Sequence, residues 1–121
     1  MSKSININQK IALIGCGYWG TIIINTLISI GFKKIIVYDI NFSNSRILKK
    51  KFKIIKLEKN YNKILNDSEI KILFFATPPS TSYKLVKKAI IKKKHVFVEK
   101  PGFKKISEFK KIIKLNKNFN N

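Results

Sequence analysis

The sequence predicts an α/β protein with a doubly wound parallel sheet of about five strands and helices on both faces. Two observations lead to this prediction. Five short apolar runs alternate with segments of helical periodicity, which is the pattern of consecutive βαβ units. The runs are apolar throughout, so each strand is expected to be covered on both faces. The crossovers between these strands should be right-handed.

The five predicted strands are the apolar runs themselves, and the third is the weakest: 10–15, 34–39, 53–57, 71–76 and 95–98. Helical periodicity and capping signals predict the helices, over 18–30, from 43 to about 51, over 60–66, from 80 or 81 to about 92, and over 106–115. Gly31 supplies a left-handed C-cap, Ser43 supplies an N-cap, and two prolines end the fourth strand. Residues 116–121 are expected to form a frayed tail.

The length of 121 residues suits one domain, so residues 1–121 are predicted to form a single domain. No apolar stretch approaches the ~18 residues that a membrane helix needs, and the first ten residues lack the apolar core of a secretory signal. The single cysteine, Cys16, has no internal partner for a disulfide. A cytoplasmic protein with no membrane partner and no metal site is expected.

The formal net charge of +20 has two explanations. It could mark a nucleic-acid partner. However, Lys, Ile and Asn make up 60 of the 121 residues and Arg occurs once, which indicates a bias toward A- and T-rich codons. A surface selected for phosphate would be expected to use Arg, and three aromatic side chains (Phe74, Phe75 and Phe97) fall in predicted buried strands. We therefore expect no specific nucleic-acid partner.

The segment IALIGCGYWG, residues 11–20, places three glycines after the first predicted strand and at the start of a helix. In this position Gly15 permits a tight turn, Gly17 lets the backbone approach a pyrophosphate, and Gly20 lets the helix lie close to the sheet. The helix start offers N–H groups and a positive dipole end to phosphates. The segment predicts a dinucleotide-binding loop, and the alternative is a glycine turn with a structural role alone.

An acidic residue at the expected distance supports the dinucleotide interpretation. Asp39 ends the second predicted strand, 19 residues after Gly20. Its carboxylate can accept hydrogen bonds from both ribose hydroxyls of an adenosine, and its charge repels a 2′-phosphate. This favours NAD over NADP, although the nearby Arg46 keeps NADP open as the alternative.

Three further residues of the glycine loop have open roles. Cys16 at a helix start could be a reactive thiol, but a small space-filling role is favoured. Tyr18 and Trp19 are large side chains that could line the mouth of a cofactor site or pack against a partner. For Trp19 a place in the core is equally consistent with the sequence.

Two later segments place polar residues at carboxyl ends of strands, where a doubly wound sheet binds its ligand. Thr77 and Pro78, in FFATPPSTSY, follow the fourth strand, where they offer a hydroxyl and a stiff backbone. Glu99 and Lys100, in HVFVEKPGF, follow the fifth strand. A lysine there can hydrogen-bond a carboxamide or a substrate oxygen, and in a site with little water it could transfer a proton.

The segments GCGYWG, VYD, ATPPSTSY and KHVFVEKP, in this order, resemble the N-terminal domain of the Gfo/Idh/MocA oxidoreductases, the glucose–fructose oxidoreductase and inositol dehydrogenase family. The resemblance implies a Rossmann domain that binds a nicotinamide dinucleotide. It places Gly15, Gly17, Tyr18, Trp19 and Gly20 around the pyrophosphate, Asp39 at the ribose, Thr77 and Pro78 beside the cofactor, and Glu99 and Lys100 at its nicotinamide end. The family's lysine in the last segment takes part in substrate binding and catalysis, and Lys100 inherits that role.

The sequence departs from the family pattern at three points. Ser82 stands where the family often has a histidine, and Lys93 stands where a glycine usually ends the helix. A left-handed backbone at Lys93 would cost roughly 1 kcal/mol. The third departure is the family's second domain, which supplies most of the substrate pocket and is expected to be absent. His95, the one histidine, matches a structural position and is a poor substitute for a missing acid or base.

The expected function is NAD(P) binding, with hydride transfer on a sugar, sugar nucleotide or polyol if a second domain completes the site. The GYWG form of the loop resembles family members that act on sugar nucleotides. A second copy or a separate second-half chain could be the partner, because the fifth strand is expected at an open sheet edge. The alternatives are a non-catalytic NAD(H)-binding module or a truncated remnant and, less favoured, a basic nucleic-acid-binding protein.

Overall fold

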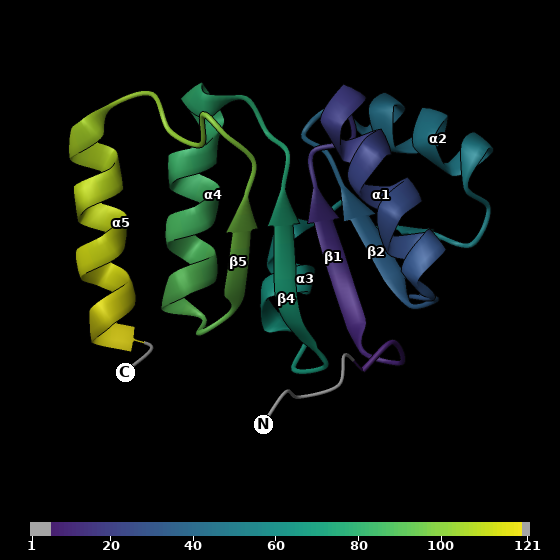
Figure 1. The fold of residues 1–121 in the computed structure, drawn as a ribbon, viewed down its shortest axis with the longest axis horizontal. Helices are drawn as coiled ribbons and strands as arrows, with labels where there is room; N and C mark the ends of the chain where they lie inside the picture. The colour runs from purple at the N-terminus through teal and green to yellow at the C-terminus, as the bar shows by residue number, and fades with distance from the viewer. Residues whose placement is uncertain (1–5, 120–121) are drawn as a thin grey trace.

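A computed structural model describes residues 6–119 of the chain. A five-stranded, all-parallel sheet forms its centre (Figure 1). The strands are β1 (Lys10–Ile14), β2 (Ile35–Tyr38), β3 (Lys56–Leu57), β4 (Ile70–Phe75) and β5 (His95–Val98), in the order β3-β2-β1-β4-β5. The order reverses between β1 and β4, which confirms the predicted doubly wound α/β fold.

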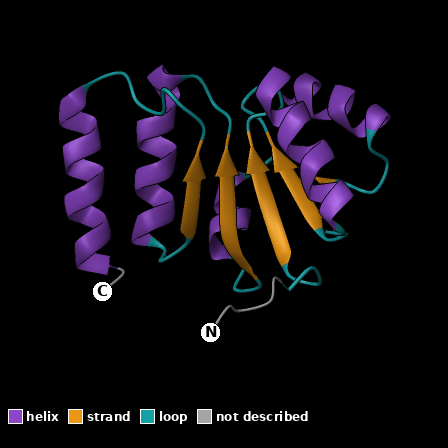
Figure 2. Cartoon of the chain, viewed as in Figure 1, coloured by secondary structure: helices purple, strands orange, loops and turns teal. Residues whose placement is uncertain are grey.

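Helices cover both faces of the sheet (Figure 2). They are α1 (Tyr18–Ile30), α2 (Phe42–Lys51), α3 (Tyr61–Asn66), α4 (Pro79–Ile91) and α5 (Ile106–Phe119). Side chains from α1 and α2 pack in a core on one face, and side chains from α3, α4 and α5 pack in a core on the other. Successive β1 residues alternate between the two cores, which explains why this strand is apolar throughout.

Three predicted helix ends are wrong. Asn41 caps α2 in place of Ser43, because its side-chain oxygen accepts the Ser43 N–H. The fourth helix begins at Pro79 and not at a hydroxyl residue, since proline at a first helical position needs no N–H partner. The last helix continues to Phe119, so the predicted frayed tail is helical over 116–119, and 120–121 lie outside the described residues.

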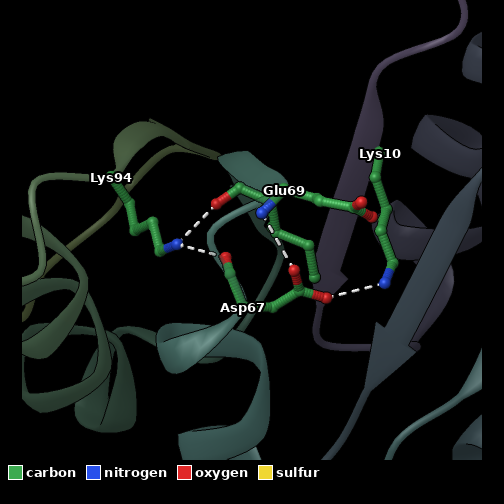
Figure 3. Close-up of polar contacts among 5 residues, drawn as sticks. Lys10, Asp67, Glu69 and Lys94 are labelled. Carbon is green, nitrogen blue, oxygen red and sulfur yellow. Dashed lines mark hydrogen bonds and ion pairs between the residues drawn. The ribbon is translucent and has the colours of Figure 1, made fainter.

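A hydrogen-bonded clamp closes the amino edge of the sheet (Figure 3). The Lys94 ammonium donates to the carbonyl oxygens of Asp67 (2.8 Å) and Ile70 (2.5 Å). The Asp67 carboxylate pairs with Lys10 (2.6 Å) and accepts the Glu69 N–H (2.9 Å). Burial lowers the pKa of Lys94, whereas the hydrogen bond from Lys10 lowers the pKa of Asp67. The clamp ties the turn before β4 to β1 and to the start of β5.

Acid should weaken this clamp. The folded pKa of Asp67 lies below its unfolded value, so its contribution is present above about pH 4 and is lost as the pH falls through the folded pKa. Asp67→Asn should lower the free energy of unfolding at pH 7 by about 1 kcal/mol. The variant should also show a smaller decrease of this free energy between pH 5 and about pH 2 than the wild type. Urea unfolding at both ends of this range measures the effect. Glu69→Gln, an exposed neighbour, is the control, and an unchanged acid dependence in Asp67→Asn would contradict the prediction.

Lys93 has a left-handed backbone, with φ of 60°. Its N–H donates to the carbonyl oxygen of Ile90 (2.8 Å), so the turn after α4 fixes this conformation. Lys93→Gly should therefore raise the free energy of unfolding by up to about 1 kcal/mol. Lys92→Gly, at a residue with φ of −83°, is the control and should lower it. Thermal melts of both variants test the prediction, and destabilisation by both glycines would count against it.

Candidate functional site

One cavity of about 520 Å³ opens at the carboxyl edge of the sheet. Parallel strands end at this edge together, so the loops after β1, β2, β4 and β5 lie at the same end of the sheet (Figure 2). Residues of all four loops line the cavity. The cavity is lined by Ile14, Gly15, Gly17, Trp19, Tyr38, Asp39, Ile40, Asn41, Asn44, Ala76, Thr77, Pro78, Pro79, Thr81, Leu85, Glu99, Lys100 and Pro101. Eight of the ten predicted site residues are in this set, and Tyr18 and Gly20 are outside it.

Gly15 and Gly20 lie so close to neighbouring backbone atoms that no side chain would fit at either position. Gly15 has φ of +98°, and a Cβ there would lie 2.6 Å from the carbonyl oxygen of Ala76. A Cβ on Gly20 would lie 2.3 Å from the carbonyl oxygen of Gly15. These contacts bring the β1–α1 loop against the end of β4 and seat the helix on its own loop. The predicted roles of Gly15 in the turn and Gly20 in close packing match this geometry.

Gly17 differs, because a Cβ there would meet no atom of the described chain within 4 Å. The residue is exposed, lines the cavity and is the N-cap of α1, where no side chain caps the helix. The first backbone N–H groups of a helix lack partners within the helix and attract anions. The open space beside Gly17 therefore has the character of a cradle for a phosphate group.

Asp39 joins the glycine loop to the start of α2. Its Oδ2 accepts the Cys16 N–H (2.8 Å), and its Oδ1 accepts the Asn41 N–H (2.8 Å). The Asn44 side-chain amide lies 3.5 Å from Oδ1. A carboxylate has about four acceptor positions, so this capping role leaves room for ribose hydroxyls. The two interpretations of Asp39 are therefore compatible, and the half-buried side chain faces the cavity.

The remaining side chains of the glycine loop differ in burial and in position relative to the cavity. Cys16 is buried, and burial raises the pKa of its thiol to about 11, so it is protonated at neutral pH and fills space beside Ser45. Trp19 is 53% exposed and lines the cavity, so a core position for it is wrong. Tyr18 is 75% exposed and packs edge-on against the Trp19 ring, outside the cavity.

The opposite wall comes from the loops after β4 and β5, with Thr77, Pro78, Glu99 and Lys100. Ser82 does not line the cavity, because its hydroxyl is buried behind this wall against Thr77. His95 begins β5 and is therefore at the amino end of the strand, away from the cavity.

Sequence reasoning missed several cavity residues, notably Asn41, Asn44, Thr81 and Leu85. Asn41 and Asn44 follow Asp39 in the turn that enters α2. Their closeness to Asp39 in the sequence is the signal that could have predicted their place in the cavity. Thr81 and Leu85 are four residues apart and share one face of α4. Arg46 is not among the lining residues, since its guanidinium lies 5.5 Å from the centre of the Phe42 ring.

The model of an oxidoreductase family with an NAD-binding Rossmann fold, the GFO_IDH_MocA family, matches residues 9–121. The chain belongs to this family. The resemblance in the sequence motifs is thereby confirmed, and the chain contains the NAD-binding Rossmann fold of Gfo/Idh/MocA oxidoreductases. Gly17 and the open space beside it fit the dinucleotide that this fold binds.

Solved structures share the Gfo/Idh/MocA fold seen here. Myo-inositol dehydrogenase from Lactobacillus casei, in complex with NAD(H) and myo-inositol, has 23% identity and a TM-score of 0.85, over 94% of this chain and 34% of that one. An NAD-binding protein from Listeria innocua has 21% identity and a TM-score of 0.80, over 94% and 34%. Biliverdin reductase from Synechocystis sp. PCC 6803, with biliverdin and NADP+, has 18% identity and a TM-score of 0.81, over 93% and 36%. The chain thus spans about a third of the length of these proteins.

No curated protein sequence matches the chain significantly. Within residues 6–119, no helix has the length and apolar character needed to cross a membrane. The same described part of the chain contains no group of three or more His, Cys, Asp or Glu side chains placed to hold a metal ion.

Proposed function

We propose that the cavity is the dinucleotide site and that each wall holds one half of NAD. The observation that carries the proposal is the open space at Gly17, flanked by Asp39 on one side and Thr77 on the other. The pyrophosphate would lie on Gly15, Gly17 and the start of α1. The adenosine ribose would bind Asp39, and the nicotinamide half would lie along Thr77, Pro78, Trp19, Glu99 and Lys100.

NAD is the preferred dinucleotide in this proposal. The Asp39 carboxylate would repel a 2′-phosphate, and Arg46, the candidate to bind such a phosphate, contacts Phe42 outside the cavity. Tyr18 and Gly20 keep indirect roles, as a support for Trp19 and as a packing residue.

The proposed reaction is hydride transfer on a sugar, sugar nucleotide or polyol, completed by a second domain. NAD supplies the hydride acceptor. Lys100 is exposed at the end of β5. Its neutral amine would accept the proton of a substrate hydroxyl as the hydride leaves for NAD, and the resulting ammonium would return that proton in the reverse reaction. The myo-inositol dehydrogenase neighbour supports a polyhydroxylated substrate. The exposure of Lys100 favours a second candidate, an NAD(H)-binding module without turnover, when no other chain covers this wall.

The proposed partner is a second copy of this chain or a chain that carries a substrate domain. β5 is at one edge of the sheet, and Phe97 on this strand is 53% exposed. An open edge strand can pair with another chain. This edge is therefore the expected side of association.

Thermal denaturation in the presence of NAD, NADH, NADP and ATP tests the proposed function. Ligands that bind the folded chain raise its melting temperature. NAD or NADH should give the largest shift. No shift with any of the four would contradict a dinucleotide site, and a larger shift with NADP would contradict the role of Asp39. Turnover assays with candidate polyols, with and without a second-domain chain, separate the enzyme from the binding module.

A further inference from the structure

Ser82 is a buried hydroxyl that contacts the cavity wall from behind. It is 1% exposed, and its Oγ lies 2.5 Å from Oγ1 of Thr77. The same Oγ lies 3.1 Å from the carbonyl oxygens of Thr77 and Pro78. Thr77 lines the cavity and Ser82 does not, so this contact connects a buried residue to the binding surface.

The short contact between the two hydroxyl oxygens can run in either direction. Each hydroxyl can donate one proton, and a carbonyl oxygen can only accept. The Pro78 carbonyl also accepts the N–H groups of Thr81 (3.0 Å) and Ser82 (3.1 Å), whereas the Thr77 carbonyl accepts the Ser82 hydroxyl. Ser82 has one hydroxyl proton for three acceptors, which are the two carbonyl oxygens and Oγ1 of Thr77. When that proton goes to a carbonyl oxygen, Thr77 is the donor in the short contact, and the Thr77 oxygen is left to accept a hydrogen bond.

We infer that Ser82 is a positioning residue that fixes the Thr77 hydroxyl as a hydrogen-bond acceptor toward the cavity, so that it binds an N–H or O–H donor of the dinucleotide and not a phosphate. This inference rests on the proposed function. Thr77 follows β4, across the reversal of strand order from Asp39, so it serves the nicotinamide half. The donors of that half are the carboxamide NH₂ and the ribose hydroxyls.

Isothermal titration of the 121-residue chain with NAD and with ADP tests the inference. ADP carries the adenosine ribose and two phosphates but lacks the nicotinamide half, so it is a matched probe. Thr77→Val and Ser82→Ala should each weaken NAD binding about threefold to tenfold and leave ADP binding unchanged. The double variant should bind NAD no more weakly than Thr77→Val, because both changes remove the same hydrogen-bonded pair of hydroxyl groups. Thr77→Ser, which keeps the hydroxyl, should bind NAD like the wild type.

A dinucleotide with an acetyl group in place of the carboxamide separates the two donors. If the carboxamide is the donor, Thr77→Val has no effect on this analogue, and if a ribose hydroxyl is the donor the effect persists. An equal loss of NAD and ADP binding in Thr77→Val would identify a phosphate contact and overturn the inference. Wild-type affinity in a folded Ser82→Ala would also overturn it. Should Ser82→Ala fail to fold by circular dichroism, the NAD-to-ADP comparison in Thr77→Val decides. A wild-type chain that binds neither ligand would instead overturn the proposed function.

Discussion

Gly17→Ala should weaken NAD binding at least tenfold while the chain remains folded. The added methyl group would meet no protein atom within 4 Å, but it would enter the space proposed for the pyrophosphate. The loss corresponds to about 1.4 kcal/mol of binding free energy or more. The stability cost should stay within about 1 kcal/mol, the difference between glycine and alanine at a helix N-cap. Isothermal titration and a thermal melt measure the two quantities.

Gly20→Ala is the matched control for this result. Its Cβ would lie 2.3 Å from the Gly15 carbonyl oxygen, and a backbone atom cannot move away without displacing the loop. We expect a loss of about 2–3 kcal/mol in the free energy of unfolding. The same substitution would thus mainly destabilise the fold at Gly20 and mainly weaken ligand binding at Gly17. Wild-type NAD affinity in Gly17→Ala would show that the ligand does not use this loop.

Asp39→Asn should lower NAD affinity about tenfold and raise the affinity for NADP relative to NAD. The charged carboxylate is the stronger acceptor for ribose hydroxyls and repels a 2′-phosphate. The variant should also lose about 1 kcal/mol of stability, because one amide oxygen replaces two carboxylate oxygens that accept the N–H groups of Cys16 and Asn41. Titrations with both dinucleotides and urea unfolding measure these changes.

Glu58→Gln controls for the change of charge in Asp39→Asn. The Glu58 carboxylate also accepts a backbone N–H, that of Asn60 (3.0 Å), but the residue does not line the cavity. It should therefore alter stability slightly and leave both dinucleotide affinities unchanged. Equal NAD affinities in the wild type and Asp39→Asn would exclude the proposed ribose contact.

Much of the fold follows from local signals in the sequence. The helix from Tyr18 to Ile30 has its predicted ends because Gly31 takes the left-handed cap, with φ of 119°. The parallel direction of the strands follows from the alternation of strands and helices in βαβ units. Parallel strands end at the same edge of the sheet, so the sequence predicts that Gly17, Asp39 and Thr77, which follow three of the strands, lie at one edge.

Other features depend on tertiary contacts that local patterns do not contain. Lys94 is buried in the clamp at the amino edge, but in a sequence with 25 lysines nothing local distinguishes it. Trp19 stands outside the core because the start of α1 opens toward the cavity. The pairing of Thr77 with Ser82 depends on α4 beginning at Pro79, which turns Ser82 inward.

The chain carries its own reporter for the central claim, that NAD occupies the cavity at Gly17. Trp19 is the one tryptophan of the sequence, lines this cavity and is half-exposed. Titration with NADH should produce a saturable change in Trp19 fluorescence in the wild type, and Gly17→Ala should require at least tenfold more ligand for the same change. A fluorescence that does not saturate, or identical titration curves for the two proteins, would contradict the assignment of the cavity as the dinucleotide site.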